Sequence, residues 1–264
     1  MDHLGLDGTA ARRALITGDP GRVGPIAEHL GGGRPVSDRR GLLVWEASCA
    51  GEPLLVVASG IGAPATAIVV EELAEAGVHT VVRVGTCGAI AAGLEPGHLV
   101  LATGAVRDEG TSRQYIEAGF PAVPDLDLTA ALAAQLAARD WPHRRGIVHS
   151  KDAYYLERAE RQVSPSETGR RWQALRTAGV VATEMESSAL FVLGSLRGLR
   201  TATLLVTVGR TTAPQLLAGA LQAAVGAVAG AFAQVGPPAG GPRPLGPRRS
   251  FLESGGDAPG DPEP

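Results

Sequence analysis

Residues 80–88 read TVVRVGTCG, and this stretch decides the fold class. Val81, Val82 and Val84 are apolar at neighbouring positions, so both faces of this strand are expected to be buried. Strands of that kind occur in sheets that helices cover on both sides. The Gly-Thr-Cys-Gly run that follows is typical of a strand end. We therefore predict a central strand of an α/β sheet here.

Similar β-rich runs alternate with Ala/Leu-rich stretches of helical length on both sides of this strand. The expected strands are Ala14–Thr17, Leu54–Ala58, Thr80–Val84, Leu99–Thr103, Gly146–Ser150 and Thr201–Val208. The expected helices are Pro64–Ala76, Leu128–Arg139, Met185–Leu196 and Pro214–Phe232. The alternation predicts an α/β fold: a single domain with a central mixed β-sheet flanked by helices.

The composition supports one domain over residues 1–235. The chain has 264 residues, of which 44% are hydrophobic, and this suffices for one substantial core. From Gly236 onward, Pro, Gly, Ser and charged residues dominate, and such a segment buries too little apolar surface to offset its ordering entropy. We therefore predict a disordered tail over residues 236–264.

The charge and the apolar runs exclude several classes of partner. A net charge of −3 without a clustered basic patch argues against nucleic-acid and membrane surfaces. The start of the chain lacks the pattern of a secretory signal. Residues 216–235 come closest to a membrane span, but their Ala and Gly content favours a packed helix. Cys49 and Cys87 indicate reduced thiols, so we expect a cytoplasmic protein.

Arg83 is the first candidate for chemistry. An arginine inside an apolar strand is costly to bury unless it meets a negative partner. Its forked guanidinium matches phosphate geometry, and Thr86 adds a hydroxyl and an amide at the end of the strand. The alternative is a structural ion pair with an acidic side chain.

Two glycine-containing turns follow other predicted strands. The turn Gly18-Asp19-Pro20-Gly21-Arg22 has amides and an arginine that can hold an anion, although the same residues also form ordinary turns. Residues 59–65, SGIGAPA, fit the loose glycine pattern of dinucleotide binding. That interpretation requires an acidic residue at the end of the next strand, where this chain has Arg83 and Thr86. An oxyanion site is therefore favoured.

Residues 183–189, TEMESSA, are expected to open a helix. Acidic residues at this place commonly compensate the helix dipole. A carboxylate there could instead bind the vicinal hydroxyls of a ribose.

In this order, the motifs resemble the nucleoside phosphorylase superfamily, closest to its uridine phosphorylase branch. The resemblance runs from about His3 to Phe232. It rests on an ordered set of short motifs: His3–Leu6, Gly18–Arg22, Gly60–Gly62, Val70–Leu73, Arg83 with Gly85 and Thr86, Phe120–Val123 and Glu184–Ser187.

The resemblance implies a phosphate site built from two subunits. Four matching positions line it in the family: Gly18, Arg22, Arg83 and Thr86. Arg40 matches an arginine that the family lends across a dimer interface to the neighbour's phosphate. The expected assembly is a homo-oligomer built from dimers, a hexamer in the usual family form.

The ribose and base sites follow from the same resemblance. His3 matches a histidine lent to the neighbour's ribose 5′-hydroxyl. Met185 and Glu186 would hold the ribose, with Glu186 on its 2′- and 3′-hydroxyls. Tyr154 matches an aromatic under the base.

Arg210 points to the uridine branch, because purine phosphorylases of this fold carry an aspartic acid at that position. The alternative is a surface arginine after a strand. The resemblance thus implies Arg83, Glu186 and Arg210 as catalytic residues, and Tyr154, Arg161 and Arg210 as base-binding residues.

The base-recognition loop departs from the family, whose uridine branch carries Gln-x-Arg there. Arg161 takes the arginine role only with a one-residue insertion, which leaves Ala159 in place of the glutamine. Without the insertion, Arg158 and Glu160 fall at the two positions. The uracil-reading amide is missing in both alignments. The family's monovalent-cation positions are Gly41 and Ala65 here, so no metal site is expected.

The implied reaction is phosphorolysis of the N-glycosidic bond of a nucleoside, with uridine as the first candidate. Inorganic phosphate is the co-substrate and no cofactor is expected. Three alternatives remain open: a phosphorylase for another base such as a purine, a nucleosidase that uses water, and a nucleoside-binding protein without catalysis.

Overall fold

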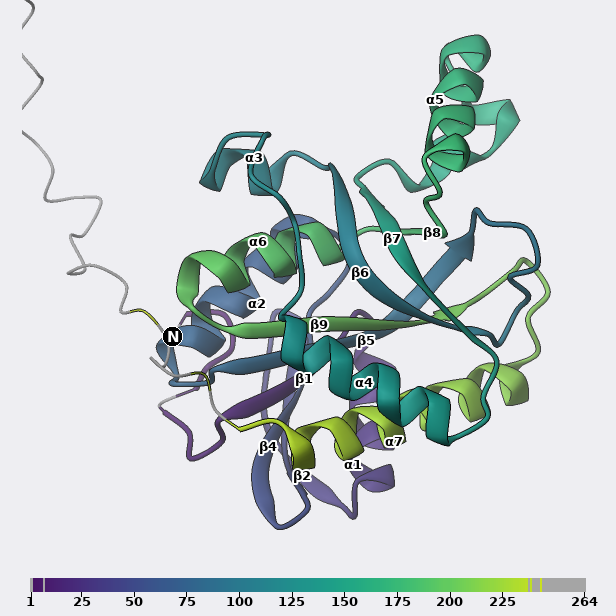
Figure 1. The fold of residues 1–264 in the computed structure, drawn as a ribbon. Coiled ribbons are helices and arrows are strands. Elements are labelled where there is room, and N and C mark those ends of the chain that lie inside the picture. The colour runs from purple at the N-terminus through teal and green to yellow at the C-terminus, as the bar shows by residue number, and fades with distance from the viewer. Residues whose placement is uncertain (1, 7, 237, 239–242, 244–264) are drawn as a thin grey trace, which may run out of the picture.

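A sheet of nine strands with helices on both faces forms the body of the protein (Figure 1). The computed structural model describes residues 2–6, 8–236, 238 and 243. The predicted disordered tail, residues 236–264, lies outside the described residues except for Gly236, Pro238 and Arg243.

The strands are β1 (Arg13–Thr17), β2 (Gly33–Arg39), β3 (Leu42–Cys49), β4 (Glu52–Ala58), β5 (Thr80–Ala89), β6 (Leu99–Asp108), β7 (His143–Lys151), β8 (Ala182–Glu184) and β9 (Arg200–Thr207). The α-helices are α1 (Val23–His29), α2 (Ala63–Glu75), α3 (Thr111–Tyr115), α4 (Leu126–Ala138), α5 (Pro165–Thr177), α6 (Ser187–Arg197) and α7 (Pro214–Gln234). Short 3-10 helices are η1 (Pro20–Arg22), η2 (Tyr154–Glu157) and η3 (Ala159–Arg161).

The sheet is mixed, as predicted. Its strand order is β2-β3-β4-β1-β5-β8-β7-β6-β9, and β9 also pairs with β5. The strands β5, β8, β7, β6 and β9 therefore close a ring. Strand β5 is parallel to β1 and β9 and antiparallel to β8. This central position explains why Val81 and Val84 are both buried, although they face opposite cores.

Helices cover the two faces of the sheet and create two cores (Figure 1). On one face, apolar residues of α2 and α6 pack together and against the sheet. On the other face, α1, α4 and α7 pack against the sheet, with α4 and α7 in mutual contact. The predicted layers of helix, sheet and helix are thereby confirmed.

Helix α7 is the one helix in the described part of the chain that is long and apolar enough to cross a membrane. Its residues Ala224, Val228 and Phe232 are buried at or below 1% exposure against the sheet and its helical neighbours. This packing is the one expected for a core helix, and it agrees with the interpretation made from sequence.

Helix α5 stands away from the body, beyond the ends of β7 and β8 (Figure 1). None of its residues is buried. The short helices η2 and η3 precede it and carry exposed aromatic and charged side chains, including Tyr154 and Arg161. The loop predicted to recognise the base therefore lies on an exposed part of the fold.

All six predicted strands and all four predicted helices are present, with shifted ends. The helix expected from Met185 begins instead at Ser187, because Glu184 belongs to β8 and Glu186 is the N-cap residue. Sequence analysis missed the hairpin β2–β3, the three-residue strand β8, and the helices α1, α3 and α5. Strand β2 lacks the expected apolar alternation, since six of its seven residues are exposed.

Replacement of Phe232 tests the packing of α7. Phe232 is 1% exposed, and its ring lies under the guanidinium of Arg13 at 5.6 Å. We expect Phe232→Ala to lower the free energy of unfolding by about 3–5 kcal/mol. Gln234 is exposed on the same helix. Denaturant titration should show that Gln234→Ala lowers the free energy of unfolding by less than about 0.5 kcal/mol. Equal small effects of both variants would contradict a core position.

Candidate active site

Two glycine loops meet beside the C-terminal ends of parallel strands β1 and β4. The amide of Ser59 donates to the Thr17 carbonyl at 2.8 Å. A Cβ on Gly18 would lie 3.1 Å from the Gly60 carbonyl oxygen, so the loops are in close contact. Ligands of open α/β sheets bind at this edge. The predicted phosphate residues Gly18 and Arg22 therefore lie at the favourable end of the sheet.

A buried ion pair joins Arg83 of β5 to Glu186, which follows β8. Both residues are 4% exposed. Arg83 donates through Nη2 to one Glu186 oxygen, and the Gly62 amide donates to the other at 2.6 Å. Burial alone would lower the pKa of Arg83, but the carboxylates of Glu186 and Glu184 outweigh it and raise that pKa. The guanidinium therefore stays charged inside the protein.

The ion pair uses only part of the Arg83 guanidinium. Its Nε and Nη1 atoms are buried, and neither has a hydrogen-bond partner among the described residues. A Cβ on Gly85 would collide with the guanidinium, so the glycine gives this side chain its room. Buried donors without an acceptor are unfavourable, and an anion that accepted from them would remove that cost. The ion pair predicted as the alternative is therefore present. Phosphate binding by the remaining donors stays a prediction.

Arg22 lies near the same place. It follows β1 in η1, and its Nε lies 3.4 Å from an Asp19 oxygen. The pKa of Arg22 is lowered, chiefly by burial; Asp19 opposes this effect and the positive charge of Arg83 adds to it. The two guanidinium groups are therefore close enough to repel each other. Such a pair favours a shared anion.

Glu184 and Glu186 have different tasks. The Glu184 carboxylate accepts from the amides of Glu186 and Ser187 at 2.9 Å and also from the Ser150 hydroxyl. It compensates the start of α6, as acidic residues at helix N-termini commonly do. Glu186 faces Arg83 instead. The structural interpretation made from sequence therefore describes Glu184, and the ribose-binding role of Glu186 stays a prediction.

Two other predicted residues lie on the same segments. Thr86 is half-buried in β5, three positions beyond Arg83. Met185 is half-buried between Glu184 and Glu186. The structure thus places the predicted phosphate and ribose residues of one subunit on adjoining loops and strands.

The N-terminal segment is tied to α2 through one carboxylate. Glu72 accepts from the His3 and Leu4 amides at 3.0 and 2.7 Å, and it contacts His3 Nδ1 at 2.8 Å. Burial alone would raise the pKa of Glu72, but the bonds from Leu4 and His3 outweigh it and lower that pKa. His3 keeps a side chain that is 33% exposed, with its Nε2 edge outside this contact. Sequence analysis quoted Glu72 within a motif without assigning this role.

Arg40 lies in the turn between β2 and β3, at the edge strand of the sheet. It is exposed and has a φ of 55°, which is uncommon outside glycine. Within the described residues, no hydrogen bond or ion pair links it to Arg22, Arg83 or Glu186. Its exposed side chain is therefore not tied to these three residues within the described subunit.

The three predicted base-binding residues are all exposed. Tyr154 is 53% exposed and packs edge-on against Tyr155 at 5.3 Å. Arg161 in η3 and Arg210 in the turn after β9 are both exposed. In the described part of the structure, none of the three forms a hydrogen bond or an ion pair with Arg83 or Glu186. Lys151, which was not predicted from the sequence, is buried and lies three residues before Tyr154.

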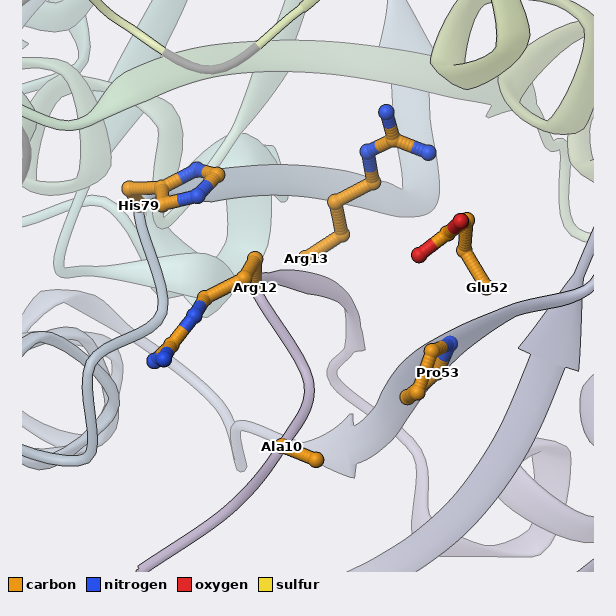
Figure 2. A pocket seen from close by; sticks show the side chains of 6 residues that line it. All are labelled: Ala10, Arg12, Arg13, Glu52, Pro53 and His79. Carbon is orange, nitrogen blue, oxygen red and sulfur yellow. The ribbon is translucent and has the colours of Figure 1, made fainter.

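A small hollow near the opposite edge of the sheet is unrelated to this site. Figure 2 shows Arg12, Arg13 and His79 around it, with Glu52 and Pro53 on the other side. It lies where β1, β4 and β5 begin. Burial, and then the nearby arginines, lower the pKa of His79. Among the described residues there is also no group of three or more His, Cys, Asp or Glu side chains placed to hold a metal ion.

The candidate site is thus an arginine–carboxylate pair beside glycine loops at the C-terminal ends of strands in a mixed α/β sheet. Residues 12–234 match the family model of the phosphorylase superfamily, and the chain belongs to that family.

Related proteins include a uridine phosphorylase of Treponema pallidum, 39% identical over 212 residues, which are 80% of this chain and 82% of that protein. A uridine phosphorylase of Thermococcus kodakarensis is 39% identical over 73% of this chain and 71% of that protein. A guanosine phosphorylase of Halorubrum lacusprofundi is 39% identical over 74% of this chain and 76% of that protein.

Glu72→Gln tests the attachment of the N-terminal segment. Because the pKa of Glu72 is lowered in the folded protein, its contribution is present above the ordinary carboxyl pKa of 4.5 and is lost as the pH falls through the lower folded value. At pH 7 we expect the variant to lose about 2 kcal/mol of unfolding free energy. The difference from wild type, measured by denaturant titration, should shrink in acid. A difference independent of pH would be the contrary result.

Proposed function

We propose that this protein cleaves the N-glycosidic bond of a nucleoside by phosphorolysis, with uridine as the principal substrate. The products are the free base and ribose 1-phosphate. Inorganic phosphate is the co-substrate, and the chemistry requires no further cofactor. A cytoplasmic location stays the sequence-based prediction.

The unsatisfied donors of Arg83 carry this proposal. A buried, charged guanidinium with two free donor atoms is suited to a tetrahedral oxyanion, which accepts hydrogen bonds from several directions. Arg22 adds a second positive charge from the loop after β1. Phosphate bound there would have an oxygen available for attack on the sugar.

Glu186 supports the second half of the site. Its two oxygens accept one bond each from Gly62 and Arg83, which leaves lone pairs for the 2′- and 3′-hydroxyls of a ribose. Phosphate oxygen then forms a bond to C1′ while the bond from C1′ to the base nitrogen breaks and its electron pair leaves with the base. The nearby phosphate anion and the carboxylate stabilise the positive character that develops on the sugar.

The relatives support uridine and keep one alternative open. Two of the three relatives described are named uridine phosphorylases, and one is named a guanosine phosphorylase. The altered loop between Tyr154 and Arg161 allows another base without any change to the phosphate and ribose residues. A nucleosidase is disfavoured, because water needs no cluster of Arg22, Arg83 and a lent Arg40.

Completion of the site by a second subunit is part of the proposal. Arg40 is exposed on the β2–β3 turn, and His3 is held at the surface by Glu72, so both are available to a neighbour. We infer a dimer in which each subunit supplies Arg40 to the other's phosphate and His3 to the other's ribose. Three such dimers would make up the hexamer that is usual in the family.

The function is tested by release of free base from uridine, thymidine, cytidine, inosine and adenosine, with and without phosphate. We expect phosphate-dependent release of uracil. Arg83→Ala should lower kcat/KM by about 10²–10³-fold and abolish the dependence on phosphate. Arg12→Ala is the matched control, since Arg12 is exposed at the opposite edge of the sheet. Normal phosphorolysis by folded Arg83→Ala would disprove the phosphate assignment.

Sharing of sites between subunits is tested by mixing two inactive variants, Arg40→Ala and Glu186→Ala. In a mixed dimer, one site has Glu186 from one subunit and Arg40 from the other, and it is intact. Random reassociation should restore about a quarter of the wild-type activity in a symmetric dimer. The mixture is measured after dissociation and reassembly, with each variant treated alone as the control. No recovery in oligomers shown to be mixed would count against the lent arginine.

A further inference from the structure

Lys151 is the only lysine in the sequence, and it is buried at the end of β7. Its exposure is 7%, although charged side chains are seldom buried without partners. Its Nζ donates to Thr183 Oγ1 at 2.9 Å and to the Glu157 carboxylate. An ammonium group has three N–H donors, so one remains for another acceptor.

The position of Thr183 brings this ammonium beside the candidate site. Thr183 lies in β8, opposite Gly88 of β5 on one side and His149 of β7 on the other. A Cβ on Gly88 would lie 3.4 Å from Thr183 Cγ2, so the threonine lies against the strand end that carries Thr86. Met185 and Glu186 follow Thr183 by two and three residues in the chain.

Aromatic rings lie beside the same ammonium. The ring centroids of Tyr154 and Trp172 are each 6.0 Å from Lys151 Nζ. Tyr154 is the residue that matches the family's aromatic under the base. A base bound against Tyr154 would therefore lie close to Lys151.

A chain of hydrogen bonds holds the ammonium in place. Burial, and then the charge of Lys151, lower the pKa of His149 to about 4, so its ring is neutral at pH 7. Its Nε2 lies 2.8 Å from an Asp108 carboxylate oxygen, which can only accept. The proton is therefore on Nε2, and Nδ1 accepts from the Thr183 hydroxyl at 3.2 Å. This leaves Thr183 Oγ1 to accept from Lys151, and the lysine is held with one donor free.

We propose that Lys151 is the base-recognition residue of this enzyme, and that it selects bases with a carbonyl oxygen at C4 of a pyrimidine or at C6 of a purine. Uracil, thymine and hypoxanthine have such an oxygen where cytosine and adenine have an amino group. An ammonium donates to the oxygen and repels the amino hydrogens. When the C1′–N bond breaks, its electron pair leaves with the base, and the negative charge spreads to the carbonyl oxygen that Lys151 contacts. This inference rests on the proposed function.

Selectivity separates this role from a structural one. Lys151→Met removes the donor and also the bond to Glu157, whereas Glu157→Gln removes only the charge of that partner. With saturating phosphate, kcat/KM is measured for uridine, cytidine, inosine and adenosine. We expect Lys151→Met to lose about 10- to 100-fold on uridine and inosine and little on the other two. Glu157→Gln should keep the preference for the oxo bases.

Two outcomes would overturn the inference. One is an unchanged preference for uridine over cytidine in Lys151→Met. The other is a parallel loss on all four nucleosides in both variants, which would show that the lysine only supports η2. Lys151→Arg gives a second check, because its retained positive charge and donors should restore part of the preference.

Failure of the proposed function would be visible separately, as no base release by wild type from any nucleoside. In that case, calorimetric titration with free uracil, cytosine, hypoxanthine and adenine tests Lys151 directly. We expect wild type to bind the two oxo bases more tightly and Lys151→Met to lose that difference. Equal affinities of wild type for oxo and amino bases would refute the role of Lys151.

Discussion

The ion pair between Arg83 and Glu186 is the interaction on which the site depends. Taking two charges out of water is costly, and their attraction repays the cost only when the remaining donors and acceptors are satisfied. Glu186 meets that condition with the amide of Gly62, but Arg83 does not, because two of its nitrogen atoms lack a partner among the described residues. The structure therefore holds a positive group that an anion would stabilise, in a place with little water to screen it.

The order of the strands explains why these groups meet. Arg83 and Glu186 are 103 residues apart in the chain, but β5 and β8 are neighbours in the sheet. The loop from β4 to α2 approaches from the side of β1, and the φ of 88° at Gly62 turns its amide toward Glu186. Glu184 fixes the turn between β8 and α6 from the other side. Each partner is thus held by an element of the rigid sheet.

Much of this arrangement could be predicted from the sequence, because its strong signals are local. Runs of β-branched residues indicated the central strands, and an arginine inside such a run indicated a buried charge with a partner. The sequence left open whether that partner was a phosphate or a carboxylate. The structure answers that Nη2 meets Glu186 while Nε and Nη1 stay free, and this division depends on a contact between distant segments that no local pattern contains.

The features that sequence analysis missed are weak locally for physical reasons. Strand β8 has three residues and exists because β5 and β7 flank it. The exposed strand β2 lacks apolar alternation. Lys151 gave one unused signal, as the single lysine of the chain directly after a predicted strand, but its partners Thr183 and Glu157 come from separate elements. Arg40 and His3 owe their expected roles to a second subunit.

The central claim is that Arg83 faces both a carboxylate and an anion. It is tested most directly by calorimetric titration of inorganic phosphate into nucleoside-free Glu186→Gln protein, with wild type alongside. We expect saturable binding that is at least as tight as in wild type, because removal of the carboxylate leaves the whole charge of Arg83 to the anion. Loss of phosphate binding in this variant, with the fold intact, would contradict it.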